Sequence, residues 1–247
     1  MKLALLADLH ANLEALDACM AHARSAGVEH WAVLGDLVGY GPDPVAVVDR
    51  VAALASRGAA VVAGNHDLAA LDGETRSMHE AATVAVDWTR GQLGPRQLEF
   101  LRGLPLAVSW GDVLFVHASA ESPRAWIYVD DAQRAARCLE RSTARYVFVG
   151  HVHEQALYHE GPRSRPVRFE PTPGVPIPVP PHRRWLAVVG SVGQPRDGNP
   201  AAAYAMADLG RGTLTFHRVP YDWRATVRKM RAAGLPEALA HVLEGRG

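Results

Sequence analysis

Five short polar clusters in this chain could do chemistry, and each directly follows a short apolar run. The clusters are Asp8-Leu9-His10, Gly35-Asp36, Gly64-Asn65-His66-Asp67, His117 and Gly150-His151-Val152-His153. Their carboxylate, amide and imidazole groups offer oxygen and nitrogen donors without thiolate, a set that suits Mn, Fe, Zn, Co or Ni ions. The number of histidines argues against Ca or Mg alone. The clusters therefore predict a site for divalent transition metals.

The apolar runs in front of the clusters predict the elements that position them. The runs cover 3–7, 31–34, 59–63, 113–116 and 146–149. Runs of this length are typical of strands buried on both faces. In an open α/β sheet, ligands bind outside the carboxyl ends of the strands. Side chains that are far apart in sequence can therefore converge in one crevice.

Each cluster taken alone also has an ordinary structural explanation, such as a turn, a helix cap or a hydrogen-bonded buried histidine. Asp8 and His10 are two positions apart, so on an extended segment both side chains would point toward one ion. His151 and His153 have the same spacing, and two imidazoles on one face of a strand end are costly to leave without partners. Since all five strand ends present Asp, Asn or His, coincidence is a poor explanation.

Further periodic segments predict a layered α/β fold with two facing sheets and helices outside. Predicted helices cover 13–23, 45–55, most of 76–103, 223–233 and 236–244, and further strands cover 104–110, 112–116, 185–189, 201–207 and 213–219. The stretch 161–181 holds eight prolines, which exclude a helix and a central strand. We favour edge strands joined by turns there over an interdomain linker or a disordered tail. We expect residues 1–247 to form a single domain.

Composition narrows the partners and the compartment. The 26 basic and 26 acidic residues balance, so no global field would gather a nucleic-acid polymer or an anionic membrane. Aromatic residues are few, at 7%, and form no stacking stripe for single-stranded nucleic acid. No apolar run approaches the roughly 18 residues that a membrane helix needs. The two cysteines, Cys19 and Cys138, lie in helix-like stretches, which indicates a reducing, cytoplasmic location.

The motifs D-x-H, G-D, G-N-H-[DE], H and G-H-x-H occur here in order and complete. In this the chain resembles the calcineurin-like metallophosphoesterases, and within them the compact bacterial members of the YfcE phosphodiesterase type. The resemblance implies a four-layer α/β/β/α sandwich with two facing mixed sheets. It also implies two metal sites and a catalytic histidine: Asp8, His10, Asp36 and His153 for one ion, Asp36, Asn65, His117 and His151 for the other, and His66 for catalysis.

The implied chemistry is hydrolysis of a phosphoester by a hydroxide that bridges two divalent ions. Two such ions, with the carboxylates of Asp8 and Asp36 and the hydroxide, leave a net local charge of about +1 that attracts a phosphate anion. A metal lowers the pKa of bound water from about 15.7 to about 7, and ions about 3.5–4 Å apart hold nucleophile and phosphoryl oxygen together. His66 would protonate the leaving oxygen or stabilise its charge, with Asp67 orienting the His66 ring.

Two segments bear on the substrate. Phosphoprotein phosphatases of this superfamily carry G-D-x-x-D-R-G, but Gly39 and Tyr40 stand at the Asp and Arg positions here. This argues against protein phosphatase-like and diadenosine tetraphosphatase-like activity. The segment 190–197 resembles a segment of the compact bacterial members. It would loop back toward the metals and offer Arg196 to substrate. The alternative is a surface turn in which Arg196 is solvated. Tyr40 and His79 would line the pocket. Alternatively, Tyr40 serves only to pack its loop and His79 is an exposed helix residue.

The sequence thus predicts a cytoplasmic phosphodiesterase that acts on a small nucleotide or similar diester. It would use two divalent transition-metal ions, for which Mn is favoured over Fe, Zn, Ni and Co. A small phosphorylated substrate is the expected partner. One alternative is a phosphomonoesterase or nucleotide pyrophosphatase with the same site. Another is a noncatalytic metal-binding scaffold, since a related eukaryotic trafficking subunit lacks the catalytic histidine. His66 is present here, which favours an enzyme.

Overall fold

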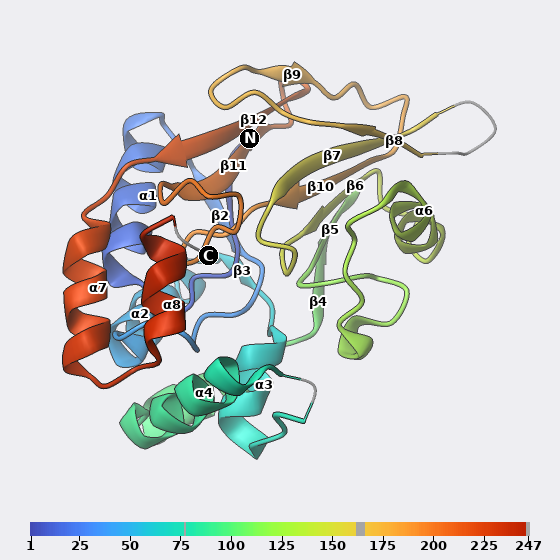
Figure 1. Ribbon diagram of the computed structural model, residues 1–247. Helices are drawn as coiled ribbons and strands as arrows, with labels where there is room; N and C mark the ends of the chain where they lie inside the picture. The colour runs from blue at the N-terminus through green and yellow to red at the C-terminus, as the bar shows by residue number, and fades with distance from the viewer. Residues whose placement is uncertain (77, 162–165, 246–247) are drawn as a thin grey trace.

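The computed structural model describes residues 1–76, 78–161 and 166–245 (Figure 1). In these residues the strands form two six-stranded sheets, with the orders β3-β2-β1-β11-β12-β9 and β4-β5-β6-β10-β7-β8. The first sheet consists of β1 (Lys2–Leu6), β2 (His30–Val33), β3 (Ala60–Val61), β9 (Ile177–Pro178), β11 (Ala202–Asp208) and β12 (Thr213–Val219). The second consists of β4 (Ala107–Trp110), β5 (Val113–Val116), β6 (Tyr146–Val149), β7 (Gln155–Glu160), β8 (Pro166–Phe169) and β10 (Trp185–Val189).

Both sheets are mixed, and their parallel parts carry the polar clusters. β1, β2 and β3 run parallel in the first sheet, while β11, β12 and β9 pair antiparallel beside them. In the second sheet β5, β6 and β10 run parallel. Because the carboxyl ends of parallel strands lie at one edge of a sheet, the loops after β1, β2 and β3 are neighbours, and so are those after β5 and β6.

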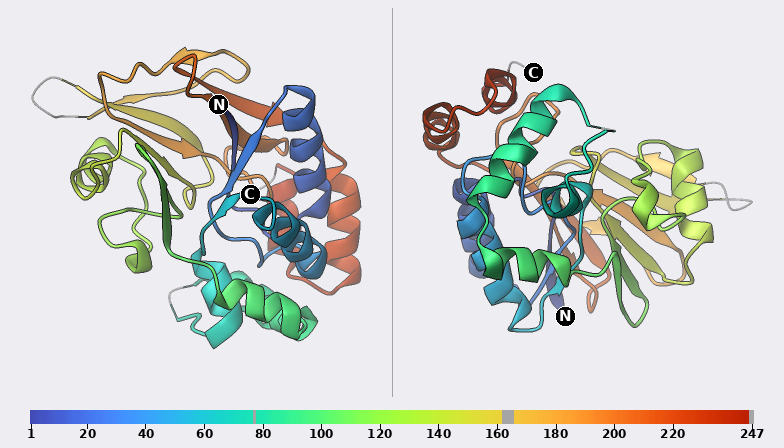
Figure 2. Two further views of the ribbon diagram at one scale, coloured as in Figure 1. Left: turned by 180° about the vertical axis from the view of Figure 1, so that it is seen from behind. Right: turned by 90° about the horizontal axis from the view of Figure 1, so that it is seen from below.

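Helices cover the outer faces of the two sheets (Figure 2). The helices of the described residues are α1 (Leu13–Ser25), α2 (Pro44–Ala55), α3 (Asn65–Asp72), α4 (Glu80–Gln92), α5 (Pro95–Arg102), α6 (Ala132–Glu140), α7 (Trp223–Ala232) and α8 (Glu237–Leu243), with a short 3-10 helix η1 (Pro123–Ala125). α1 and α2 pack on the first sheet, and α6 packs on the second. The predicted α/β/β/α sandwich is therefore confirmed. The assignment of residues 1–247 to a single domain stays a prediction.

Strand periodicity sorts the apolar side chains into layers. Along β1, Ala4 and Leu6 enter the core beneath α1 and α2, whereas Leu3 and Leu5 enter the core between the sheets. Phe115 from β5 joins this second core from the opposite sheet. Both faces of these strands are therefore buried, which explains why their sequences read as continuous apolar runs.

The predicted helices and strands are present, although some strands are shorter than predicted and some elements, such as β7, were not predicted. The run 59–63 forms a strand only at Ala60–Val61. The helix α3, which begins directly at Asn65, was not predicted. A capping interaction starts it, because the carboxylate of Asp67 accepts the backbone N–H of Gly64 at 2.9 Å. The Gly-x-x-Asp spacing at 64–67 was the signal for this helix start.

The proline-rich stretch forms edge strands, as predicted. β8 lies at one edge of the second sheet and β9 at one edge of the first. Proline is tolerated at such edges because the missing N–H has no ladder partner to lose. Residues 162–165 of this stretch lie outside the described residues.

A helical cluster lies beside the carboxyl ends of the strands. α7 and α8 pack on α4 through a core that includes Tyr40, Ala85, Val227 and Leu239. Figure 1 shows α8 next to α7 and above α4, near the end of the first sheet where the polar clusters lie. In the part of the chain that the structure describes, no helix combines the length and apolar character needed to cross a membrane.

Candidate metal centre

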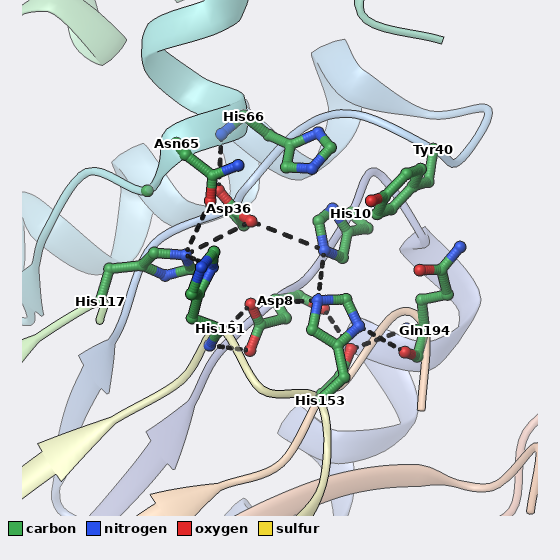
Figure 3. A network of polar contacts seen from close by, with 12 residues as sticks. Asp8, His10, Asp36, Tyr40, Asn65, His66, His117, His151, His153 and Gln194 are labelled. Atoms are coloured by element: carbon green, nitrogen blue, oxygen red, sulfur yellow. Dashed lines mark hydrogen bonds and ion pairs between the residues drawn. The ribbon is translucent and has the colours of Figure 1, made fainter. Parts of the chain in front are cut away.

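The seven predicted ligands meet between the two sheets, at the carboxyl ends of the parallel strands (Figure 3). Their donor atoms form two groups, within each of which all atoms lie within 4.8 Å of one another. The groups are Asp8, His10, Asp36 and His153, and Asp36, His117 and His151, with Asn65 beside the second. Asp36 belongs to both. This arrangement matches the two ligand sets that the family resemblance implies, although the roles of these residues as ligands stay predictions.

In the first group the donor atoms face one another at short range. His10 Nε2 lies 3.1 Å from His153 Nε2 and 3.7 Å from Asp36 Oδ2. His153 Nε2 lies 3.5 Å from Asp8 Oδ1. All four side chains are buried, with at most 2% of the residue exposed. The group is thus a buried cluster of two imidazoles and two carboxylates.

The second group is built around His117. Its Nε2 lies 3.1 Å from His151 Nδ1, 3.2 Å from Asn65 Oδ1 and 3.4 Å from Asp36 Oδ2. Figure 3 shows His117 and His151 on one side of Asp36 and His10 and His153 on the other. A carboxylate in this position can serve ions on both sides of it.

Backbone carbonyls fix the orientation of all four imidazoles. The ring nitrogens that point away from the centre contact carbonyl oxygens: His10 Nδ1 with Val38 at 3.1 Å, His117 Nδ1 with Leu34 at 2.6 Å, His151 Nε2 with Trp126 at 3.0 Å and His153 Nδ1 with Gln194 at 2.7 Å. A carbonyl can only accept, so each outer nitrogen carries the hydrogen, and whenever the ring is neutral its inner nitrogen presents a lone pair. Lone pairs facing at 3.1 Å repel unless a cation lies between them, so the donor set fits metal ions.

The electrostatics of the centre favour positive charge as well. Burial raises the pKa of Asp8 to about 8, so its carboxylate needs a cation to stay ionised at neutral pH. Burial also acts to raise the pKa of Asp36, but His117 and His66 hold it well below the usual range. Burial opposes protonation of His117 and Asp36 favours it, with a net rise of the His117 pKa to about 9.

The backbone of the ligand loops differs from the predicted extended form. Asp8, His10, Asp36, His151 and His153 all have positive φ, between 45° and 67°. The expectation that an extended segment aims Asp8 and His10 at one ion is therefore wrong in conformation, although both side chains reach the same group. His151 and His153 diverge into different groups instead of sharing one face. Asp and His tolerate left-handed backbone better than most residues, and such strain clusters at functional sites.

His66 lies at the start of α3, between the centre and a cavity. Its ring packs edge-on against His10, with centroids 4.9 Å apart, and against Tyr40 at 4.5 Å. Its buried Nδ1 has no hydrogen-bond partner among the described residues. Burial lowers the pKa of His66 to about 4, against an upward effect of Asp36. The ring is therefore held by packing against His10 and Tyr40 and not by a hydrogen bond at Nδ1 among the described residues.

The prediction that Asp67 orients the His66 ring is wrong. Asp67 Oδ1 accepts the backbone N–H groups of Leu37 at 2.8 Å and Val38 at 3.3 Å, and Oδ2 accepts that of Gly64. The carboxylate thus ties the loop after β2 to the start of α3. This loop carries Asp36, so Asp67 positions a candidate ligand rather than the His66 imidazole.

Gly39 is the residue that sets the position of the His66 ring. It has φ of +84°, and a Cβ there would lie 2.4 Å from His66 Nδ1. We expect Gly39→Ala to displace the ring and lower kcat about 10-fold or more, with the metal content unchanged. Gly58→Ala is the matched control, because Gly58 also has positive φ, at +91°, and a Cβ there meets nothing within 4 Å. Equal kcat in the two variants would contradict this placement.

Tyr40 and Arg196 lie together beside the first ligand group. Arg196 Nη2 donates to the Tyr40 hydroxyl at 3.3 Å, and this hydroxyl lies 3.5 Å from His79 Nε2. The Arg196 backbone N–H donates to the carbonyl of His153. The segment 190–197 therefore loops back to the centre, as expected, and Tyr40, His79 and Arg196 all line the cavity. Contact of Tyr40 and Arg196 with substrate stays a prediction.

A partly exposed ion pair holds the loop that carries Arg196. Arg218 on β12 donates to both carboxylate oxygens of Asp197, at 2.8 and 3.0 Å, and its side chain is only 9% exposed. We expect Arg218→Met to raise KM about 3- to 10-fold with little change in kcat, because Arg196 keeps its charge and loses its position. Steady-state kinetics test this, with the exposed Arg211→Met as control. An unchanged KM would show that the loop holds its place without the pair.

Sequence reasoning missed several contributors to the site. The carbonyls of Val38, Leu34, Trp126 and Gln194 orient the histidines, and no side-chain pattern signals a carbonyl. It also missed the segment 126–128, where Tyr128 stacks on His151 with centroids 4.1 Å apart. The two aromatic residues so close together, just before the helix around Cys138, were the available signal.

Comparisons with known proteins agree with this geometry. Residues 1–212 match the calcineurin-like phosphoesterase superfamily domain, so α7 and α8 lie beyond the matched region. The crystal structure of a metallophosphoesterase from Sphaerobacter thermophilus is 36% identical, with a TM-score of 0.89 and 100% of both chains covered. An uncharacterised protein of Methanocaldococcus jannaschii is 30% identical, over 98% of this chain and 96% of its own length. A hypothetical protein of Pyrococcus horikoshii shares the fold, at 19% identity and a TM-score of 0.78, over 100% of this chain and 98% of its own.

Proposed function

Because the chain belongs to the calcineurin-like phosphoesterase superfamily, as its motifs predicted, we propose that it is a phosphodiesterase that uses two divalent metal ions. The superfamily hydrolyses phosphoesters, and the chain has candidate metal-ligand groups. The observation that carries the proposal is that Asp36 belongs to both ligand groups, next to a cavity lined by His66 and Arg196. A small phosphodiester is the substrate class that we propose.

When bound, the two ions would lower the pKa of water and polarise the phosphoryl group. The chain's own residues would do the rest. His66 lines the cavity, and its imidazole would hold or donate a proton at the leaving oxygen. Arg196, steadied by its hydrogen bond to Tyr40, would orient a phosphoryl oxygen. The histidine–carbonyl contacts keep the donor atoms in place during turnover.

The charge of the cavity supports a diester over a monoester. Arg196 is the only Lys or Arg among the described residues that line it. Tyr40 occupies the position where phosphoprotein phosphatases of the superfamily carry an arginine, and burial raises its pKa to about 12, so it stays neutral. A diester carries one negative charge, whereas a monoester carries about two at neutral pH. One guanidinium beside two metal ions suits the smaller charge.

Hydrolysis of two model esters tests the proposal. Metal-stripped protein reloaded with Mn, the ion that we propose, is assayed with bis-p-nitrophenyl phosphate and p-nitrophenyl phosphate, and bound metal is counted by elemental analysis. We expect about two ions per chain and a kcat/KM at least 10-fold higher for the diester. Preference for the monoester would favour a phosphatase instead. Two bound ions without turnover of either ester would favour a noncatalytic scaffold.

We further propose that the protein acts in the cytoplasm on a small phosphorylated molecule. Its two cysteines, Cys19 and Cys138, are buried free thiols, as suits a reducing compartment. Fractionation of cells that express the tagged chain would test the location. Recovery with the membrane or periplasmic fraction would contradict it.

A further inference from the structure

A cavity of about 520 Å³ opens beside the candidate metal centre. Asn65, His66 and His151 line its inner end, where the phosphoryl group would lie under the proposed function. A cavity of this size accepts a drug-sized organic molecule, which is much larger than a phosphate. The remaining walls would therefore contact the organic part of the substrate.

One wall is apolar and comes from two helices. It consists of Met78 just before α4, Ala81 and Ala82 at the start of α4, and Ala238, Leu239 and Val242 on α8. Leu239 and Ala82 also belong to the core that joins α8 to α4, so this wall is anchored from behind. Figure 1 shows α8 and α4 on the same side of the strand ends. The α8 part of this wall lies beyond residues 1–212, which match the superfamily domain, whereas the α4 part lies within them.

A second wall is aromatic and comes from the segment after η1. Trp126 and Tyr128 both line the cavity. The Trp126 backbone is held at φ 52°, and its carbonyl accepts the His151 ring N–H at 3.0 Å, so the metal ligand fixes the segment. Tyr128 stacks on His151 and keeps 41% of its surface exposed. Aromatic surface is thus presented within reach of the phosphoryl end.

The charges of the cavity are confined to one end. Arg196 lies near the metal centre with Tyr40, and none of the lining residues that the structure describes is an Asp or Glu. A cationic substituent would find no carboxylate partner in this part of the chain. A flat apolar group would instead bury its faces against the two walls.

We propose, building on the phosphodiesterase function above, that the substrate carries a planar aromatic group, which lies between the Trp126–Tyr128 segment and the α8 wall. The aromatic group belongs to one of the two alcohols esterified to the phosphate. A nucleobase and a simple aryl ring share this chemistry, and the experiment below distinguishes them.

A series of diesters with one leaving group measures the preference. Methyl, phenyl and thymidine 5′ esters of p-nitrophenyl phosphate share the chemistry of the cleaved bond. We expect kcat/KM to be at least 10-fold higher for the phenyl or thymidine ester than for the methyl ester. A higher value for thymidine than for phenyl assigns the site to a nucleobase, and the reverse order assigns it to an aryl group. Equal values for all three esters would overturn the inference.

Binding provides a readout that does not depend on turnover. Calorimetry with Mn-loaded protein compares methyl phosphate, phenyl phosphate and thymidine 5′-monophosphate, which lack the p-nitrophenyl ring. We expect the better aromatic ligand to bind at least 10-fold more tightly than methyl phosphate. If no ester is hydrolysed but this preference is found, the proposed function fails and the aromatic site stands. If the esters are hydrolysed without any preference in either measurement, the function stands and the aromatic site fails.

Variants on both walls locate the site. Ala238→Trp fills the cavity from α8, and we expect the aromatic preference to fall at least 5-fold in both measurements. Ala232→Trp, the same change at an exposed position on α7 outside the cavity, should keep the preference. Tyr128→Ala tests the opposite wall and should reduce the preference with the metal content unchanged. Full preference in both Ala238→Trp and Tyr128→Ala would overturn the inference.

Discussion

Replacement of His66 by asparagine is expected to lower kcat for bis-p-nitrophenyl phosphate about 10²- to 10⁴-fold while both metal ions stay bound. The imidazole is absent from both ligand groups, so its loss removes no donor atom from the centre. It lies in the wall of the cavity, and its Nδ1 has no hydrogen-bond partner among the described residues, so the substitution breaks no hydrogen bond at that atom. Asparagine fills part of the space and cannot transfer a proton near neutral pH.

The measurement combines turnover with metal analysis. His182→Asn, the same substitution at an exposed position away from the centre, serves as the control and should keep full activity. Wild-type turnover in His66→Asn would contradict a catalytic role. Loss of metal together with activity would instead assign His66 to the architecture of the centre.

Much of the fold and of the centre could be predicted because local patterns carry them. Strands buried on both faces leave continuous apolar runs, and their carboxyl ends are where an α/β fold gathers its site. The amino-acid sequence alone therefore predicts that Asp8, Asp36 and His117 lie together. The edge strands in the proline-rich stretch follow from the missing N–H of proline. Both are consequences of chemistry within a few neighbouring residues.

The parts that could not be predicted depend on partners far apart in sequence. Asp67 follows His66 directly, which suggested a catalytic pair, yet its oxygens bind backbone N–H groups of the loop after β2. The left-handed backbone of His151 and His153 sends neighbouring imidazoles to different ligand groups. The wall from α8 lies more than 80 positions from the last ligand in sequence, with no motif of its own. Such features depend on tertiary packing, which a single sequence does not display.

The histidine lone pairs that face each other imply that metal binding contributes to folding stability. A ligand that binds only the native state stabilises it by about 2.7 kcal/mol at a concentration 100 times its Kd. Two ions would then raise the free energy of unfolding by about 5 kcal/mol. For a chain of this size, this corresponds to a rise of about 10–20 °C in the thermal midpoint. We therefore expect Mn to raise the midpoint of metal-stripped protein by this amount, as measured by calorimetry or circular dichroism.

Asp36→Asn should abolish most of this metal-dependent rise and lower activity at least 10³-fold, because Asp36 is the carboxylate that both ligand groups share. Asp87→Asn, an exposed Asp on α4, is the matched control and should show the full rise. A rise about half as large in Asp36→Asn would mean that one ion binds without the shared carboxylate. A full rise in Asp36→Asn would show that the ions are held elsewhere, and the two-ion centre described here would be wrong.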